Sequence, residues 1–185
     1  MMMKTIVRSL LFCSALLFMA ACENEPVVSN APGSEMNKTE NAVFDVSNAC
    51  YTTDLIAGQF YPAGNVYVKM DANNVYVIYN AINNWKIKAT HLYVGDCNQI
   101  PQTGTGNPIP GRFPLATQNS GGVQQVVYTI AKSGLGDCFC IAAHAEVSRP
   151  GQSETAWAKG ENFPGSNWAM FFSICKSNCS DEEQY

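Results

Sequence analysis

The two histidines of this 185-residue sequence are the side chains best suited to proton or metal chemistry near neutral pH. His91 and His144 each lie in a segment that alternates like a β-strand. Glu146 shares a face with His144, because side chains two residues apart in a strand point to the same side. If the two strands are neighbours, the three side chains could form a small metal or acid–base site. The alternative, which we expect, is that each ring is hydrogen-bonded within or between sheets.

The eight cysteines are a second chemically informative set. Cys13 and Cys22 lie near the start, and six follow in the rest of the chain: Cys50, Cys97, Cys138, Cys140, Cys175 and Cys179. An even number of cysteines in an exported domain predicts disulfides. Cys138 and Cys140 would share one face of one strand, a poor geometry for bonding each other, and excluding that bond leaves twelve of the fifteen possible pairings. A zinc site is the alternative, but Cys-X-Cys lacks the usual ligand spacing.

Trp85, Trp157 and Trp168 are candidate ligand-binding residues, because the faces of aromatic rings attract the C–H groups of sugars. Most large aromatic residues are nevertheless expected in the core. A pair of carboxylates could hydrolyse a glycoside, and five are available whose spacing selects no pair: Asp96, Asp137, Glu146, Glu154 and Glu161. The chain has no Gly-X-Ser-X-Gly, no His-Glu-X-X-His and no phosphate-binding glycine loop. We therefore expect no enzyme and no cofactor.

The composition is typical of a globular protein, and we expect no nucleic acid as a partner. Hydrophobic residues make up 46% and charged residues only 14% of the chain. The formal net charge is -4, from 11 basic and 15 acidic residues. Loss of Lys4 and Arg8 with a leader would leave nine basic against 15 acidic residues, and a charge of -6. An acidic chain is a poor partner for the phosphate backbone.

Residues 1–21 are predicted to be a signal peptide. Two basic residues precede an uncharged run from 9 to 19, which is far short of the ~20 residues that span a bilayer. Residues 19–22, Met-Ala-Ala-Cys, resemble the lipobox of bacterial lipoproteins, although Met stands in place of the commoner Leu. The resemblance implies that Cys22 is acylated and becomes the mature N-terminus. The alternative is an ordinary signal peptide with a coincidental cysteine.

Residues 22–42 are predicted to be a lipidated, flexible tether. The segment has few large apolar residues, two prolines and scattered charge, so it cannot bury enough surface to fold. Acyl chains on Cys22 would hold the protein on a membrane. Glu23 is not the Asp that retains some bacterial lipoproteins on the inner membrane, so we expect the cell outer membrane. A glycan or a surface protein is a further possible partner.

Residues 43–185 are predicted to form a single domain, an all-β antiparallel β-sandwich of about eight strands stapled by disulfides. Short alternating segments are separated by turn residues, and no stretch has a helical period. We expect a hairpin over residues 65–79 and further strands at 85–94, 123–130, 138–147, 154–158 and 168–175. In the strand at 138–147 the core face is expected to carry Phe139, Ile141, Ala143, Ala145 and Val147.

Residues 96–122 are a connection that departs from the short-loop pattern. The segment is rich in Gly, Pro, Gln, Asn and Thr, and unstructured loops beyond ~12 to 15 residues are uncommon. One interpretation is a functional loop. The other is a structured cover that caps one end of the sandwich with Ile109, Phe113 and Leu115.

Five short motifs together resemble a largely uncharacterised β-rich domain of bacterial secreted and surface-anchored proteins. They are Thr90–Gly95 (THLYVG), Asn107–Gly111 (NPIPG), Cys140–Val147 (CIAAHAEV), Ser153–Ala158 (SETAWA) and Gly165–Met170 (GSNWAM). The resemblance covers about Cys50 to Cys175 and implies a β fold and an extracellular location. That family has no assigned reaction, so the resemblance implies no site residues.

These observations predict a membrane-anchored bacterial surface lipoprotein with a binding or structural β domain. The alternative is a carbohydrate-binding module that captures polysaccharide, and a glycoside-cleaving enzyme is the third possibility. Aromatic side chains on the surface would favour the carbohydrate-binding module, whereas buried aromatic side chains would favour the first interpretation.

Overall fold

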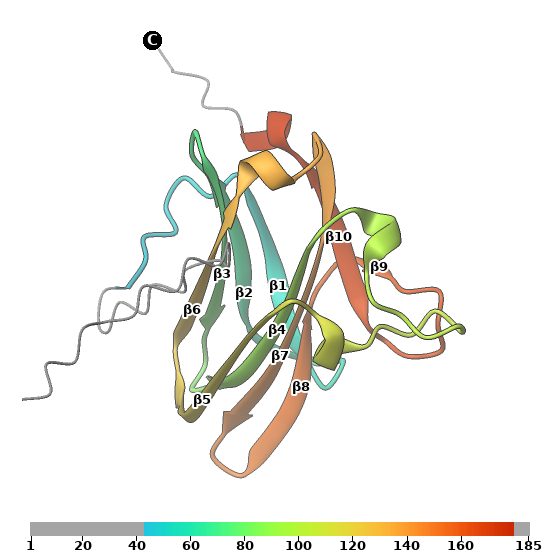
Figure 1. Ribbon diagram of the computed structural model, residues 1–185. Helices are drawn as coiled ribbons and strands as arrows, with labels where there is room; N and C mark the ends of the chain where they lie inside the picture. The colour runs from blue at the N-terminus through green and yellow to red at the C-terminus, as the bar shows by residue number, and fades with distance from the viewer. Residues whose placement is uncertain (1–42, 180–185) are drawn as a thin grey trace, which may run out of the picture. The chain divides into compact units, whose positions relative to one another are not determined.

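The computed structural model describes residues 43–179, which form ten β-strands and four short 3-10 helices (Figure 1). The strands are β1 (Tyr51–Ala57), β2 (Tyr61–Met70), β3 (Asn74–Ala81), β4 (Lys86–Gly95), β5 (Leu115–Val123), β6 (Gln125–Ala131), β7 (Cys138–Arg149), β8 (Gln152–Ala158), β9 (Glu161–Asn162) and β10 (Met170–Cys175). The 3-10 helices are η1 (Cys97–Gln99), η2 (Pro110–Arg112), η3 (Lys132–Gly134) and η4 (Lys176–Cys179). The predicted signal peptide, the tether and Cys22 lie outside the described residues. Within residues 43–179 no helix is long and apolar enough to cross a membrane.

The strands form an antiparallel sheet in the order β5-β4-β7-β8-β1-β2-β3-β6 that curls into a nearly closed barrel (Figure 1). β10 pairs with β7 beside β8, and the short β9 pairs with β10. The prediction of an all-β antiparallel fold is therefore confirmed. The structure differs from the predicted sandwich in one respect, because the strands form one curled sheet and not two stacked sheets.

Local irregularities in the strands let the sheet curl. The pairing register shifts between Leu55 and Ile56 in β1, and again between Ile87 and Ala89 in β4. Such bulges bend a strand and increase its twist. In β2, a β carbon at Gly64 would collide with the carbonyl oxygen of Asn80 on β3, so only glycine allows this close approach.

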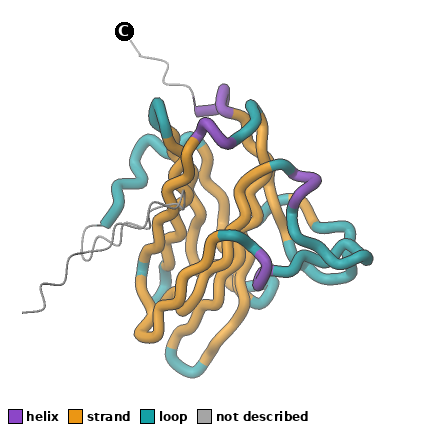
Figure 2. Tube along the Cα trace, viewed as in Figure 1, coloured by secondary structure: helices purple, strands orange, loops and turns teal. Residues whose placement is uncertain are grey.

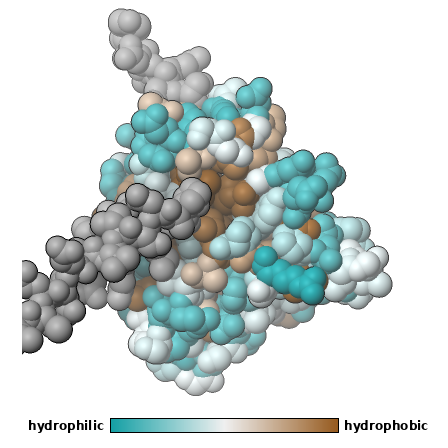
Figure 3. Space-filling view, viewed as in Figure 1, coloured by the Kyte–Doolittle hydropathy of each residue, from teal (hydrophilic) through white to brown (hydrophobic). Residues whose placement is uncertain are grey.

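The end strands β5 and β6 follow each other in the chain but do not pair, and hydrogen-bonded side chains link the two edges of the sheet. The Tyr128 hydroxyl on β6 donates to Oγ1 of Thr117 on β5 over 3.2 Å. It also lies 2.6 Å from Oγ1 of the buried Thr90 on β4. Half-buried apolar residues such as Val94, Leu115 and Ile130 pack against the core from these strands. Figure 3 shows an apolar area near the middle of the viewed face.

The inner face of β7 lies at the centre of the barrel core. The five residues predicted for the core face are all buried: Phe139, Ile141, Ala143, Ala145 and Val147. The prediction of this face is confirmed. The opposite face of β7 is also buried over Cys140, Ala142 and His144, because a second, smaller cluster covers it from outside the barrel.

Residues 96–114 supply much of this outer cover. Ile100 and Phe113 are buried against Tyr93 of β4 and Trp157 of β8. Of the two interpretations of this segment, the structured cover agrees with the structure. The cover lies on the outer face of β4, β7 and β8, however, and not across an end of the barrel as predicted. Leu115 packs against the barrel core instead. The predicted loop also ends early, because residues 115–123 form β5.

Three disulfides join all six cysteines of the described domain, as the sequence predicted. The pairs are Cys50–Cys179, Cys97–Cys140 and Cys138–Cys175. Cys138 and Cys140 have different partners, in agreement with the excluded pairing. The bridges connect the two ends of the described chain, η1 to β7, and β7 to β10. Each typically contributes about 2 to 4 kcal/mol to the free energy of unfolding.

Replacing Ala143 by Glu should prevent folding. The side chain at position 143 is fully buried, so the substitution would place an unpaired carboxylate in the core, and overpacking alone costs ~1 to 3 kcal/mol. The matched control is Ala131→Glu on β6, where the side chain is exposed and the change should be within ~0.5 kcal/mol. Urea denaturation, monitored by tryptophan fluorescence, measures the stability of both variants. An unfolding midpoint of Ala143→Glu equal to that of the control would contradict the described core.

Candidate functional site

His91 and His144 lie directly opposite each other on the paired strands β4 and β7. Their Nδ1 atoms are 3.3 Å apart, so one ring carries its proton on Nδ1 and donates it to the other. His144 is buried, whereas His91 is partly exposed. The two histidines, which the sequence placed on separate strands, therefore meet on the outer face of the barrel.

The surroundings of His144 keep its ring neutral. Burial, and then the positive charge of a protonated His91, lower the pKa of His144 to about 4. Its ring also packs against Trp157, with ring centroids 4.8 Å apart. Glu146 does not join the pair, since it is exposed and lies opposite Ala89 and Thr155. Residues 43–179 hold no cluster of three His, Cys, Asp or Glu side chains that could bind a metal.

Three of the carboxylates considered for glycoside hydrolysis have local structural surroundings of their own. Asp96 caps η1 by accepting a hydrogen bond from the Asn98 amide. Glu154 on β8 accepts one from the side-chain amide of Gln152 over 3.0 Å. Glu146 pairs in register with Thr155, so it lies on the face opposite to that of Glu154.

Two of the three candidate tryptophans are part of the protein interior. Trp85 is fully buried, and the guanidinium of Arg149 lies 4.5 Å from the centre of its ring. Trp157 is only 5% exposed because Phe113 and Phe163 pack edge-on against it. Burial therefore removes Trp85 and Trp157 from the candidate ligand-binding residues and leaves Trp168.

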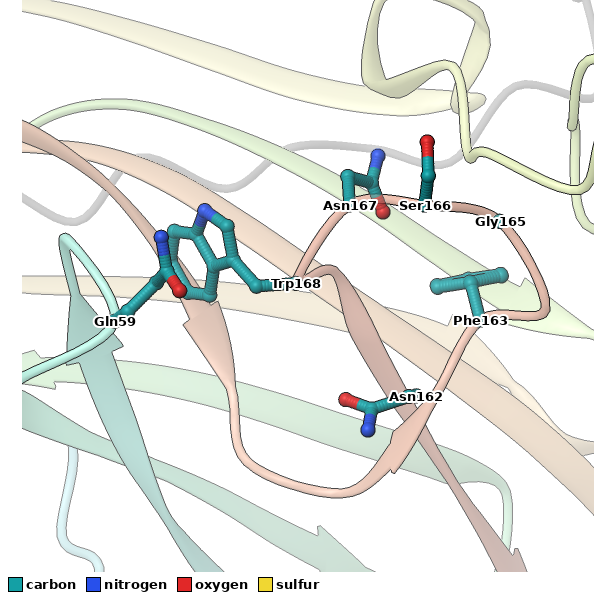
Figure 4. A pocket seen from close by; sticks show the side chains of 7 residues that line it. All are labelled: Gln59, Asn162, Phe163, Gly165, Ser166, Asn167 and Trp168. Carbon is teal, nitrogen blue, oxygen red and sulfur yellow. The ribbon is translucent and has the colours of Figure 1, made fainter.

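Trp168 lines an open hollow of about 390 Å³ on the domain surface (Figure 4). The segment after β9 supplies most of the wall and the turn between β1 and β2 supplies the rest. The side chains around the hollow are amides, a hydroxyl and aromatic rings, without a charge: Gln59, Asn162, Phe163, Ser166, Asn167 and Trp168. We call this the Trp168 hollow. Figure 4 shows the Gln59 side chain beside the indole ring of Trp168.

Several polar groups at the Trp168 hollow lack a partner within the described part of the chain. The side chains of Gln59, Asn162 and Ser166 form no hydrogen bond there, and neither does the indole N–H of Trp168. The Asn167 side chain, in contrast, has one partner, because its oxygen accepts a hydrogen bond from the Ala169 amide. Amides and hydroxyls that are not used internally are available to a ligand.

The turn that presents Gln59 has an uncommon backbone conformation. Gly58 and Gln59 have φ of 53° and 73°, and the Phe60 amide donates to the Ala57 carbonyl over 3.1 Å to close a β-turn within the three-residue loop between β1 and β2. Glycine adopts positive φ readily, whereas glutamine does not. A non-glycine residue with positive φ, such as Gln59, has a conformational strain of about 1 to 3 kcal/mol, and the interactions of the surrounding hairpin must offset this strain.

The opposite wall of the hollow is held by the long cover segment. Figure 2 shows the loops around residues 96–114 and 163–169 on the same side of the domain. The Asn167 amide donates to Oδ1 of Asn107 over 3.2 Å, and the Phe163 amide donates to the Ala169 carbonyl over 3.0 Å. A β carbon at Gly165 would collide with Oδ1 of Asn107. The wall is thereby fixed in position before any ligand arrives.

A second hollow, of about 460 Å³, has a different chemical character. Lys132 and Lys176 line it together with Asn73 and Asn74. Each ammonium group donates one hydrogen bond within the domain, Lys132 to the Asp71 carbonyl and Lys176 to the Leu135 carbonyl. No aromatic ring among the described residues lines this second hollow, so we regard the Trp168 hollow as the better candidate site.

Comparison with family models, curated proteins and solved structures finds no match to this chain. The resemblance to a bacterial surface domain therefore stays a prediction. Of the residues at the Trp168 hollow, sequence reasoning found only Trp168. The run Asn162–Trp168, which combines turn residues with two aromatics, was the available signal for the others on that wall.

The free energy of unfolding should fall as the pH is lowered from about 6.5 towards 4. In this window the unfolded state protonates position 144 whereas the native state does not, because the pKa of His144 is lowered to about 4. Each pKa unit corresponds to about 1.4 kcal/mol, so the loss at pH 4 should approach about 3 kcal/mol. Chemical denaturation at intervals between pH 7.5 and 4.5 measures it.

Two variants separate the causes of this pH dependence. His144→Gln should flatten the decline, whatever it does to the absolute stability. His91→Gln should keep most of the decline, because burial is the larger cause of the lowered pKa of His144. An unchanged slope in His144→Gln would show that another group titrates.

Proposed function

We propose that the chain is an exported, lipid-anchored surface protein of a bacterium whose β domain binds a ligand at the Trp168 hollow. The observation that carries the proposal is the pairing of all six domain cysteines in disulfides. Disulfides persist in oxidising compartments outside the cytosol. This pattern supports export, which is what the predicted signal peptide over residues 1–21 would direct.

The location of the protein after export follows from Cys22. The six domain cysteines are consumed by disulfides, and Cys22 stands at the end of a segment that resembles a lipobox. Acylation at Cys22 would anchor the domain by lipid, with residues 22–42 as the tether. Because Glu23 is not an inner-membrane retention residue, we propose the cell outer membrane.

A binding role is supported by the way in which the domain presents the Trp168 hollow. Disulfides and the outer cover brace a rigid barrel, and surface loops carry the uncharged side chains of the hollow. Rigid scaffolds that hold polar and aromatic side chains on loops are a common arrangement for ligand recognition. The unpaired groups of Gln59, Asn162 and Ser166 give a ligand hydrogen-bonding partners.

Replacing Cys22 by Ser should abolish membrane anchoring. The variant should appear in the soluble fraction or accumulate as an uncleaved precursor, because no thiol is available for acylation at that position. Fractionation of cells, together with metabolic labelling by a palmitate analogue, measures the effect. Cys13→Ser is the control and should remain processed, labelled and membrane-bound. A Cys22→Ser protein that is labelled and anchored like the wild type would refute the lipid anchor.

A further inference from the structure

We infer that the Trp168 hollow binds a neutral saccharide, through stacking on Trp168 and hydrogen bonds to the side chains of Gln59, Asn162 and Ser166. This inference rests on the proposed function, namely that the domain binds a ligand at this hollow. It adds the chemical class of the ligand and the residues that would recognise it. Its support comes from the aromatic ring, the unpaired polar groups, the lack of charge and the rigidity of the walls.

The aromatic ring gives the apolar part of the recognition. Trp168 is half-buried, so its ring is braced from one side and remains partly accessible to solvent in the hollow. Of the three tryptophans it is the only one that is not buried. A sugar ring presents a face of C–H groups, which pack on the electron-rich face of an indole, and the apolar burial adds to this attraction.

The polar groups give the complementary part. Sugar hydroxyls both donate and accept hydrogen bonds, and so do side-chain amides and hydroxyls. Gln59 and Asn162 each offer an unused carbonyl and an unused NH₂ group, and Ser166 offers a hydroxyl. The hollow therefore contains the mixture of donors and acceptors that a polyhydroxylated ring requires.

The lack of charge indicates a neutral ligand. None of the residues that line the Trp168 hollow is ionisable, whereas two lysines line the second hollow. Recognition of a uronic acid, a sulfated sugar or a phosphate usually employs Arg or Lys. The volume of about 390 Å³ lies near the lower end of the ~300 to 1,000 Å³ range of small-molecule sites, so a short stretch of a chain fits.

Because the walls of the hollow are rigid, binding a ligand costs little free energy for ordering side chains and loops. The Asn107 side chain fixes the wall that carries Asn167, and a hydrogen-bonded β-turn fixes Gln59. The left-handed conformation of Gln59 is a strained position beside a hollow, and such strain is often retained for function. A preorganised site gains affinity because little conformational entropy is lost.

A competing explanation for ligand binding is that an exposed apolar surface around Phe60 binds hydrophobic ligands without selectivity. The Phe60 side chain is 76% exposed next to Gln59 but does not line the hollow. General hydrophobic attachment would depend on Phe60 at least as much as on Trp168. Saccharide recognition in the hollow depends on Trp168 and the amides, so the two explanations differ in their sensitive residues.

The test is a glycan array probed with the detergent-solubilised full-length protein, followed by titration of any bound glycan against tryptophan fluorescence. We expect binding of one or more neutral glycans and weak binding of acidic ones. Trp168→Ala and the double variant Gln59→Ala with Asn162→Ala should each weaken binding by about tenfold or more. Phe60→Ala is the matched control and should bind like the wild type. Thermal melts of every variant establish that it is folded.

The inference would be overturned by no bound glycan in the array, by a folded Trp168→Ala protein with wild-type affinity, or by equal losses in Phe60→Ala and Trp168→Ala. Preference for acidic glycans would also overturn it, because the hollow lacks a cation. These results would leave the anchored location intact, since that part of the proposed function is judged by fractionation of Cys22→Ser. Conversely, a Cys22→Ser protein that is labelled and anchored like the wild type, together with glycan binding at the hollow, would refute the lipid anchor alone.

Discussion

The burial of β7 on both faces is the constraint on which the rest of the domain depends. Its inner side chains fill the barrel, and its outer side chains lie beneath the cover formed by residues 96–114. β4 pairs along one edge, while β8 and β10 share the other. Such a strand must carry small or apolar side chains on both sides, and Ala142, Ala143 and Ala145 meet this requirement. The histidine pair and two of the three disulfides are positioned by residues of this strand.

Local alternation was enough to predict most strands, but not those whose stability comes from pairing. β5 has Leu115 and Val123 at its ends and only small or polar residues between them, so no hydrophobic pattern marks it. It forms because β4 offers a free edge. β1 was missed for a related reason, since Thr and Asp alternate with its apolar residues only weakly. Closure of the barrel depends on bulges and on Gly64, whose roles come from long-range register.

The candidate site shows the same division between local and long-range information. Trp168 was a candidate from residue type alone, as were Trp85 and Trp157, and only burial distinguishes the three. Gln59 is more than 100 positions from Trp168 in the sequence and meets it through the folding of the sheet. The histidines were predicted to lie on strands, but their direct pairing required the register of β4 and β7.

The bridge between Cys50 and Cys179 has a further consequence when a protease cuts the chain. All ten strands lie between these two residues, so the bridge makes the described domain a covalent ring. A single cut in any surface loop would leave the pieces joined by this bond as well as by the sheet. Nicked molecules would run as one species without reductant and separate only after reduction. The domain can thus survive a cleavage that would release fragments from an unbridged barrel.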